Sequence, residues 1–268
     1  MVNLSESKIN NFQRKIFTWW KVYKRDLPWR ETTNPYYIMI SEVMLQQTQV
    51  SRSIEKYHEF INEFPTIKKL ANAPISSVLK VWSGLGYNRR ALWLHEAANQ
   101  ILELKEFPKK PEELQKLKGI GPYTSRSILI FAYNHDLATV DTNIRRILIA
   151  EKFATEDTKE KELFDIAEKL LPKGRAKDWH NALMDYGALV LTAAKTGIKP
   201  KTANTEKTKE NRLFRGSIVK YLTEKMKASK KQIIKDCNIP SDKVEDLLLS
   251  LLNDGLIVKI KNYYTLPK

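Results

Sequence analysis

Across roughly the first two hundred residues, apolar side chains recur at steps of three and four positions, and glycines are scarce. One such stripe is formed by Phe12, Ile16, Trp19, Trp20 and Tyr23. Residues at this spacing share one face of a helix, whereas a half-buried strand alternates between apolar and polar residues. Because such alternation is found only near the end of the chain, the sequence predicts an all-α fold for this long region.

Residues 195–211 differ in composition from the segments on either side. They are rich in lysine, threonine, asparagine and glutamate, and they almost lack large apolar side chains. Such a composition is typical of a linker. We therefore expect a helical domain over residues 1–194, a linker over 195–211 and a small domain over 212–268.

The small domain combines helical spacing with one short alternating hairpin. Ser229 is expected to cap its second helix, and Ser241 to begin its third. Three helices followed by a hairpin indicate a winged helix. The expected elements are helices over 213–222, 229–236 and 241–252 and strands over 256–260 and 263–266.

The chain of 268 residues carries a formal net charge of +15, which favours a polyanion such as nucleic acid as its partner. A generally lysine-rich proteome would explain the same surplus. The one cysteine, Cys237, excludes an internal disulfide and a cysteine-based zinc or iron–sulfur site. Since no signal peptide or membrane-length apolar run is found, we expect a cytoplasmic, nucleoid-associated protein that does not enter a membrane.

A glycine-containing turn at Leu117–Thr124 lies between two predicted helices. Gly119 and Gly121 are expected to allow positive φ angles and a close backbone approach. Amides at the start of the following helix would then point outward together, which suits a DNA phosphate. The alternative is a plain corner between helices, with glycine required for packing.

Four segments of the chain resemble known DNA repair enzymes. Leu117–Thr124 resembles the helix-hairpin-helix of the DNA glycosylase superfamily that includes endonuclease III, and Ala138–Arg146 is similar to its aspartate segment. Ser41–Val50 and Trp82–Tyr87 resemble the adenine glycosylases of the MutY type, and the string Ser-Glu-Val-Met-Leu-Gln-Gln-Thr is the most specific of these matches. The resemblance spans roughly residues 8–192 and implies two helical subdomains with a cleft.

Two carboxylates are the candidates for catalysis. Glu42 lies among apolar residues on a predicted helix, and burial there favours the neutral acid, which can donate a proton. Asp141 precedes a predicted helix, so by position alone it is first an N-cap. The resemblance implies that Glu42 protonates adenine and that Asp141 stabilises the positive charge that develops at C1′ of the sugar.

The residue at position 123, a tyrosine, indicates whether the protein is expected to cleave the DNA strand. Relatives that also break the strand have a lysine at this position, which forms a Schiff base with the sugar. The resemblance therefore implies a monofunctional enzyme that leaves an abasic site, although Lys116 and Lys118 leave weak nicking open. Asn143 and Asp185 match polar groups that support catalysis.

The resemblance also assigns residues that contact the DNA. Gln47 and Tyr87 match positions that push into the duplex, while Thr48 and Leu85 match positions that touch the opposite base. Ordinary packing would also explain Tyr87. The edge of the base pocket is assigned to Arg25, Trp29 and Arg30, although Trp29 would fit a core position equally well. Apart from the resemblance, Arg89 and Arg90 are candidates for phosphate contacts, although a solvated helix face would explain them as well. The full set of expected phosphate contacts is Gly119, Gly121, Tyr123, Thr124, Arg89 and Arg90.

The chain departs from the family in two respects. The family usually holds a [4Fe–4S] cluster with four cysteines, the first of which corresponds to Leu191, so we expect no cluster and no other cofactor. The sequence leaves open whether the backbone carbonyls of Gln115, Leu117 and Ile120 bind a monovalent cation. Relatives that detect 8-oxoguanine carry a larger, Nudix-like C-terminal domain, for which this chain has too few residues left.

We therefore expect a monomeric, monofunctional DNA glycosylase that flips and excises adenine mispaired with guanine or 8-oxoguanine in duplex DNA. A thymine or uracil mismatch glycosylase of the same fold is the first alternative. A noncatalytic DNA-binding protein on this scaffold is the second, and Glu42 together with Asp141 argues against it. A winged-helix regulator would leave the first two hundred residues unexplained.

Overall fold

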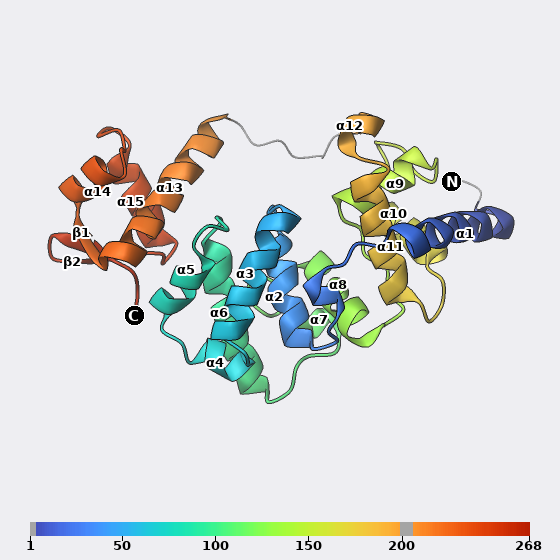
Figure 1. Ribbon diagram of the computed structural model, residues 1–268, viewed down its shortest axis with the longest axis horizontal. Coiled ribbons are helices and arrows are strands. Elements are labelled where there is room, and N and C mark those ends of the chain that lie inside the picture. The colour runs from blue at the N-terminus through green and yellow to red at the C-terminus, as the bar shows by residue number, and fades with distance from the viewer. Residues whose placement is uncertain (1–3, 199–205) are drawn as a thin grey trace. The chain divides into compact units, whose positions relative to one another are not determined.

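Helices dominate the part of the chain that the structure describes, as the three-and-four spacing predicts. The structure is a computed structural model, and it describes residues 4–198 and 206–268. The chain forms two compact units, each assembled from segments that are distant in the sequence (Figure 1). Unit 1 consists of Met1–Met39, Lys109–Gln115 and Ile120–Thr202. Unit 2 consists of Ile40–Pro108, Lys116–Gly119 and Ala203–Lys268.

Unit 1 is held together by an aromatic and aliphatic core. Phe12 contacts both Phe153 and Trp179, with ring centroids 4.9 and 5.6 Å apart, and α11 packs against α1 and α9. Full burial of each such ring contributes roughly 1.5–3 kcal/mol. The elements are α1 (Glu6–Tyr23), η1 (Pro28–Arg30), the start of α2 (Pro35–Leu45), α7 (Pro111–Leu114), α8 (Pro122–Tyr133), α9 (Thr142–Ala150), α10 (Glu160–Leu170), α11 (Ala176–Leu189) and α12 (Ala193–Thr196).

The first part of unit 2 is a helical cluster around Trp82. The Trp82 ring meets Phe60 edge to face, with centroids 5.9 Å apart, and α6 packs against α4 and α5. The apolar residues of α5 recur at the predicted spacing, so Val78, Leu79 and Trp82 are all buried. The helices are the end of α2, α3 (Val50–Glu63), α4 (Ile67–Ala71), α5 (Ile75–Trp82) and α6 (Arg89–Leu104).

The C-terminal part of unit 2 contains the predicted three helices and hairpin, together with one further strand. The three strands form an antiparallel sheet in the order β1-β3-β2, with Tyr264 paired to Ala228 on one side and to Lys259 on the other. The elements are α13 (Glu206–Lys225), β1 (Lys227–Ser229), α14 (Lys230–Asp236), α15 (Val244–Asn253), β2 (Val258–Ile260) and β3 (Tyr263–Thr265).

Several predicted boundaries in this part were wrong. The second helix is capped by Ser229 as predicted, but the third begins at Val244, and its N-cap residue is Lys243 rather than Ser241. The first begins at Glu206, so the end of the predicted linker 195–211 is helical, while residues 199–205 lie outside the described residues. Strand β1 is too short to show alternation. Residues from Ala203 onward group with Ile40–Pro108, and the expected division into domains stays a prediction.

None of the helices within residues 4–198 and 206–268 combines the length and the hydropathy that crossing a membrane requires.

Candidate active site and DNA-contacting turns

The helix α2 places Glu42 among buried neighbours. Its start follows from the Asn34–Pro35 pair, because the Asn34 side chain accepts a hydrogen bond from the Tyr36 amide at 3.0 Å and proline is favourable in the first turn. Ser41, Glu42 and Val43 are all buried, and Glu42 is 7% exposed. The predicted burial of this carboxyl group is confirmed.

Arg90 fastens the end of α2. Its buried guanidinium donates to the carbonyls of Val43, Met44 and Gln46 at 2.8, 3.0 and 2.6 Å. It also donates to the Gly86 carbonyl at 3.1 Å. A cation at a helix C-terminus is favourable, and burial lowers the pKa of Arg90 only to about 10, so it stays charged at neutral pH. The structure therefore corrects the phosphate role predicted for Arg90, which is buried and whose Nη atoms already donate to oxygens of the protein.

Two turns next to Arg90 carry the residues predicted to open the duplex. Gln47 and Tyr87 both have left-handed backbones, with φ angles of 56° and 48°, which are unfavourable for side chains of this size. Gln47 is exposed and Tyr87 is half-buried. The Thr48 hydroxyl accepts a bond from Arg90 at 3.0 Å, and Leu85 is buried. Arg90 thus ties both turns to the end of the helix that bears Glu42.

The glycine-containing turn before α8 was predicted in part. Gly119 has a φ of 75°, and a Cβ atom there would lie 2.8 Å from the Cβ of Trp93, so both the backbone and the packing require glycine. Gly121 is instead the N-cap of α8 with a φ of −91°, which any residue adopts, so the expectation of a positive φ there was wrong. Tyr123 and Thr124 lie in the first turn of α8, where helical amides have no acceptor within the helix.

Asp141 is the N-cap of α9, as its position alone suggested. One carboxylate oxygen accepts from the Ile144 amide at 2.7 Å, and the other accepts from the Asn143 side chain at 3.0 Å. Burial raises the pKa of Asp141, and these hydrogen bonds and the nearby charge of Arg146 partly offset the increase. Asp141 and Asn143, both predicted to take part in catalysis, therefore lie together.

Arg146, which is not among the residues predicted from the sequence, sets the orientation of the Asn143 side-chain amide. It donates to the Asn143 carbonyl oxygen at 2.5 Å, and this leaves the amide NH2 to face Asp141. It also donates to the carbonyls of Gly187 and Leu191 at 2.9 and 2.5 Å. The spacing of Asn143 and Arg146 at i and i+3 on a helix was the available sequence signal.

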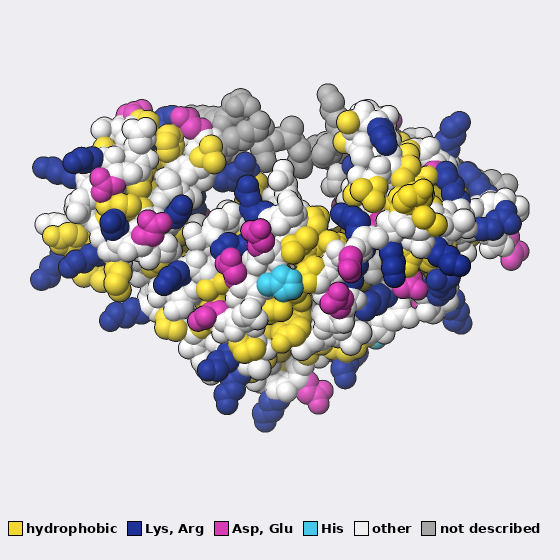
Figure 2. All heavy atoms as spheres, in the orientation of Figure 1, with side chains coloured by type: hydrophobic (Ala, Val, Ile, Leu, Met, Phe, Trp, Pro, Cys, Tyr) yellow, Lys and Arg dark blue, Asp and Glu magenta, His cyan; other side chains and the backbone are white. Residues whose placement is uncertain are grey.

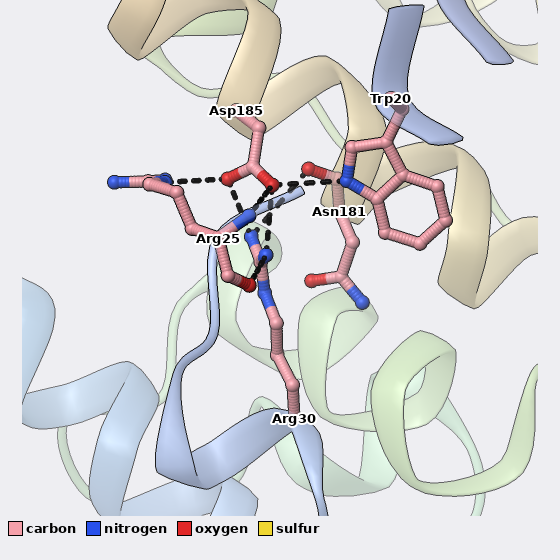
Figure 3. A network of polar contacts seen from close by, with 5 residues as sticks. All are labelled: Trp20, Arg25, Arg30, Asn181 and Asp185. Atoms are coloured by element: carbon pink, nitrogen blue, oxygen red, sulfur yellow. Dashed lines mark hydrogen bonds and ion pairs between the residues drawn. The ribbon is translucent and has the colours of Figure 1, made fainter. Parts of the chain in front are cut away.

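Asp185 binds both predicted pocket arginines (Figure 3). Its buried carboxylate accepts from Arg30 at 2.8 Å with each oxygen and from the Nε of Arg25 at 2.5 Å. The Trp20 indole, not predicted from the sequence, donates to it at 2.9 Å. Burial raises the pKa of Asp185, but the hydrogen bonds from Arg30 and Arg25 and the charge of Arg30 outweigh it, so the pKa lies below its ordinary value. The network fastens the segment that carries Trp29, which is buried, to α11.

The residues near Leu191 do not fit the iron–sulfur cluster of the family. The Leu191 amide donates to the Tyr186 carbonyl at 3.0 Å, and its side chain packs against the core of unit 1. Within the described part of the chain, no group of three His, Cys, Asp or Glu residues could hold a metal ion. The sequence contains one cysteine, Cys237, so four thiolate ligands are not available from this chain.

Residues 40–173, which include Glu42, the glycine turn and Asp141, match a family model described as HhH-GPD superfamily base excision DNA repair protein. The chain belongs to the HhH-GPD superfamily. This HhH-GPD protein is 37% identical to the adenine DNA glycosylase of Buchnera aphidicola over 211 residues, covering 76% of this chain and 60% of that protein. It is 38% identical to the adenine DNA glycosylase of Mycolicibacterium smegmatis over 184 residues, covering 67% and 63%. The chain thus spans somewhat under two thirds of the length of these curated relatives.

Solved structures agree with the family assignment. A thermostable thymine-DNA glycosylase superposes with a TM-score of 0.66 at 27% identity, covering 72% of this HhH-GPD protein and 92% of that chain. Endonuclease III in a trapped DNA complex gives a TM-score of 0.64 at 18% identity, covering 74% and 92%, and this likeness shows the fold alone. The predicted helical fold of the endonuclease III superfamily is confirmed.

Proposed function

We propose that this protein is a monofunctional DNA glycosylase that removes adenine mispaired with guanine or 8-oxoguanine and leaves an abasic site. The burial of Glu42 within the string shared with adenine glycosylases carries the proposal, because a buried carboxyl group is favoured in the neutral form that can donate a proton. The identity to adenine DNA glycosylases from two bacteria supports adenine as the base.

The proposed reaction uses both carboxylates. Glu42 donates a proton to N7 of the flipped adenine, so the electron pair of the C1′–N9 bond leaves with a neutral base. Asp141, held by the Ile144 amide and Asn143, stabilises the positive charge at C1′. Water then adds to C1′ and releases a proton, giving the abasic sugar. Tyr123 cannot form a Schiff base, so the strand stays intact.

The partner is duplex DNA with a mismatched base pair, bound by a monomer at the nucleoid. The high positive charge supports binding to DNA, and Figure 2 shows Lys and Arg side chains scattered across the visible face. In the C-terminal part, α15 has no Lys or Arg and carries the exposed residues Glu245 and Asp246. We therefore assign the added DNA grip of the proposed winged helix to α14, where Lys231 and Lys235 are exposed, rather than to α15.

The decisive experiment is single-turnover excision from duplexes with adenine opposite 8-oxoguanine, guanine or cytosine, and with thymine or uracil opposite guanine. We expect release of adenine opposite 8-oxoguanine or guanine, and loss of that release in Glu42→Gln. The exposed Glu63→Gln, on the neighbouring helix α3, is the matched control and should retain full activity. Release of thymine or uracil alone would refute the proposal.

A thymine mismatch glycosylase is the second candidate. The likeness to a thermostable thymine-DNA glycosylase, at 27% identity, favours it. The same panel separates the two, because it contains both bases. Borohydride trapping during the reaction tests the monofunctional assignment, and a strong covalent adduct would contradict it.

A further inference from the structure

The C-terminal part of unit 2 is fastened onto α5 and α6. Helix α13 packs against α5. Asp254, just after α15, forms ion pairs with Arg89 of α6 at 3.3 Å and with Arg215 of α13. This ion pair also gives Arg89 a protein partner at the surface where the sequence predicted a phosphate contact. The two parts of unit 2 therefore meet through helix packing and through ion pairs.

Arg212 of α13 holds Tyr87 at this junction. Its guanidinium carbon lies 4.8 Å from the centre of the Tyr87 ring, and its Nη1 donates to the Tyr87 hydroxyl. Arg90 lies 5.3 Å from the same ring. A tyrosine whose backbone is left-handed, with a φ of 48°, is thus held by one arginine from each part of unit 2.

The contacts continue from Tyr87 toward Glu42. Arg90 contacts the Tyr87 ring and donates to the carbonyls of Val43 and Met44, which directly follow Glu42 in α2. A continuous series of contacts therefore joins α13 to the end of the helix that bears the proposed acid.

We propose that Arg212 is a positioning residue, which holds Tyr87 in its strained turn and thereby makes the C-terminal part of the chain a contributor to duplex opening. The inference rests on the proposed glycosylase function. Arg212 acts through the Tyr87 hydroxyl and ring, so its effect depends on Tyr87. A lysine can supply the charge and one donor, but not the planar stacking group of arginine.

The test is a double-mutant cycle of Arg212→Gln and Tyr87→Phe. Two quantities are measured: the single-turnover rate constant for adenine excision, and the fluorescence of 2-aminopurine placed beside the mispair, which reports unstacking without excision. We expect each single variant to lower both the rate constant and the unstacking signal. The rate constants should fall about tenfold, and the double variant should be no slower than either, since contacting residues couple by roughly 0.5–3 kcal/mol. Arg212→Lys should restore part of the loss.

Lys220→Gln is the matched control, because Lys220 is an exposed cation on the same helix. It should excise and unstack like the wild type. Wild-type behaviour of Arg212→Gln, faster excision by it, or fully additive effects would each overturn the proposal. If the wild type unstacks DNA without excising adenine, the coupling in fluorescence still decides the role of Arg212 while the proposed function fails. A wild type that does neither refutes both.

Discussion

Asp141 uses its two carboxylate oxygens for different purposes, and one substitution separates them. The oxygen that accepts the Ile144 amide caps α9, and the oxygen that faces Asn143 belongs to the proposed site. Asparagine caps helices about as well as aspartate, but its NH2 would face the Asn143 NH2, so Asp141→Asn should lower the free energy of unfolding by about 1–3 kcal/mol. Excision should fall at least about a hundredfold, because the charge near C1′ is lost.

The measurement pairs single-turnover excision with urea unfolding of the same protein. Loss of activity together with a loss of stability well above about 3 kcal/mol would mean that Asp141 is chiefly a cap. Retention of full activity would refute the proposed role of its charge.

A substitution at Gly187 tests the placement of Asn143 beside Asp141. A Cβ atom at Gly187 would lie 2.9 Å from the Cβ of Asn143, so Gly187→Ala should displace Asn143 from Asp141. We expect a loss of about 1–3 kcal/mol in the free energy of unfolding together with slower excision. Gly216→Ala in α13 is the control, because a Cβ atom there meets nothing within 4 Å. Equal behaviour of the two variants would show that the close contact has no effect.

At the scale of elements, His180 joins α11 to the segment that precedes Asp141. Its Nε2 accepts the Thr139 amide at 3.1 Å, and its Nδ1 donates to the Ala176 carbonyl at 2.8 Å. The contact at Nε2 requires the neutral ring, because a proton on Nε2 would face the Thr139 N–H. Burial lowers the pKa of His180 from 6.5 to about 4.

This shift predicts acid sensitivity with a defined sign. The folded pKa is depressed, so between pH 6.5 and about 4 the unfolded chain binds the extra proton, and the stabilisation is lost as the pH falls. Because of His180 alone, the free energy of unfolding should fall by about 3 kcal/mol between pH 7 and pH 4. Urea unfolding across this range should show a smaller acid loss in His180→Gln, whose side-chain oxygen can still accept the amide. Parallel curves for the two proteins would contradict the prediction.

The sequence predicted elements where a local pattern determines them. The spacing of Phe12 and Ile16 predicted an apolar helix face, and Ser229 predicted a helix start, because both signals lie within one or two turns. Lys243 rather than Ser241 precedes α15, and Gly121 has an extended backbone, because the surrounding packing decides these details. The hold of Arg90 on the end of α2 could not be assigned from the sequence, since these acceptors lie more than forty positions away.

The site was predicted as a set of residues but not as a set of contacts. Asp141 with Asn143, and Asp185 with Arg25 and Arg30, were named from the resemblance, and the structure brings each group together. Trp20 belongs to an apolar stripe, and no neighbouring residue in the sequence indicates that its indole N–H donates to Asp185, which lies far along the chain.

At the scale of the whole molecule, we expect the affinity for DNA to depend on where the positive charges lie and not on the net charge alone. Replacing both Lys231 and Lys235 of α14 with glutamine should reduce the slope of log affinity against log salt by about 2, because each phosphate contact contributes about 0.9. Fluorescence anisotropy with a mismatched duplex at several salt concentrations measures the slope. The same exchange at Lys68 and Lys69 of α4, which are also exposed, is the control. An equal fall in both variants would show that net charge alone matters.

The interleaving of the two units has a consequence for the order in which the protein folds during synthesis. Unit 2 begins at Ile40 but ends at Lys268, while unit 1 is complete at Thr202. In a chain that emerges from the ribosome N-terminus first, all of unit 1 therefore emerges before Arg212 does. The surface of α5 that α13 covers stays open until α13 has emerged, and during that period the nascent chain is exposed to chaperones and proteases.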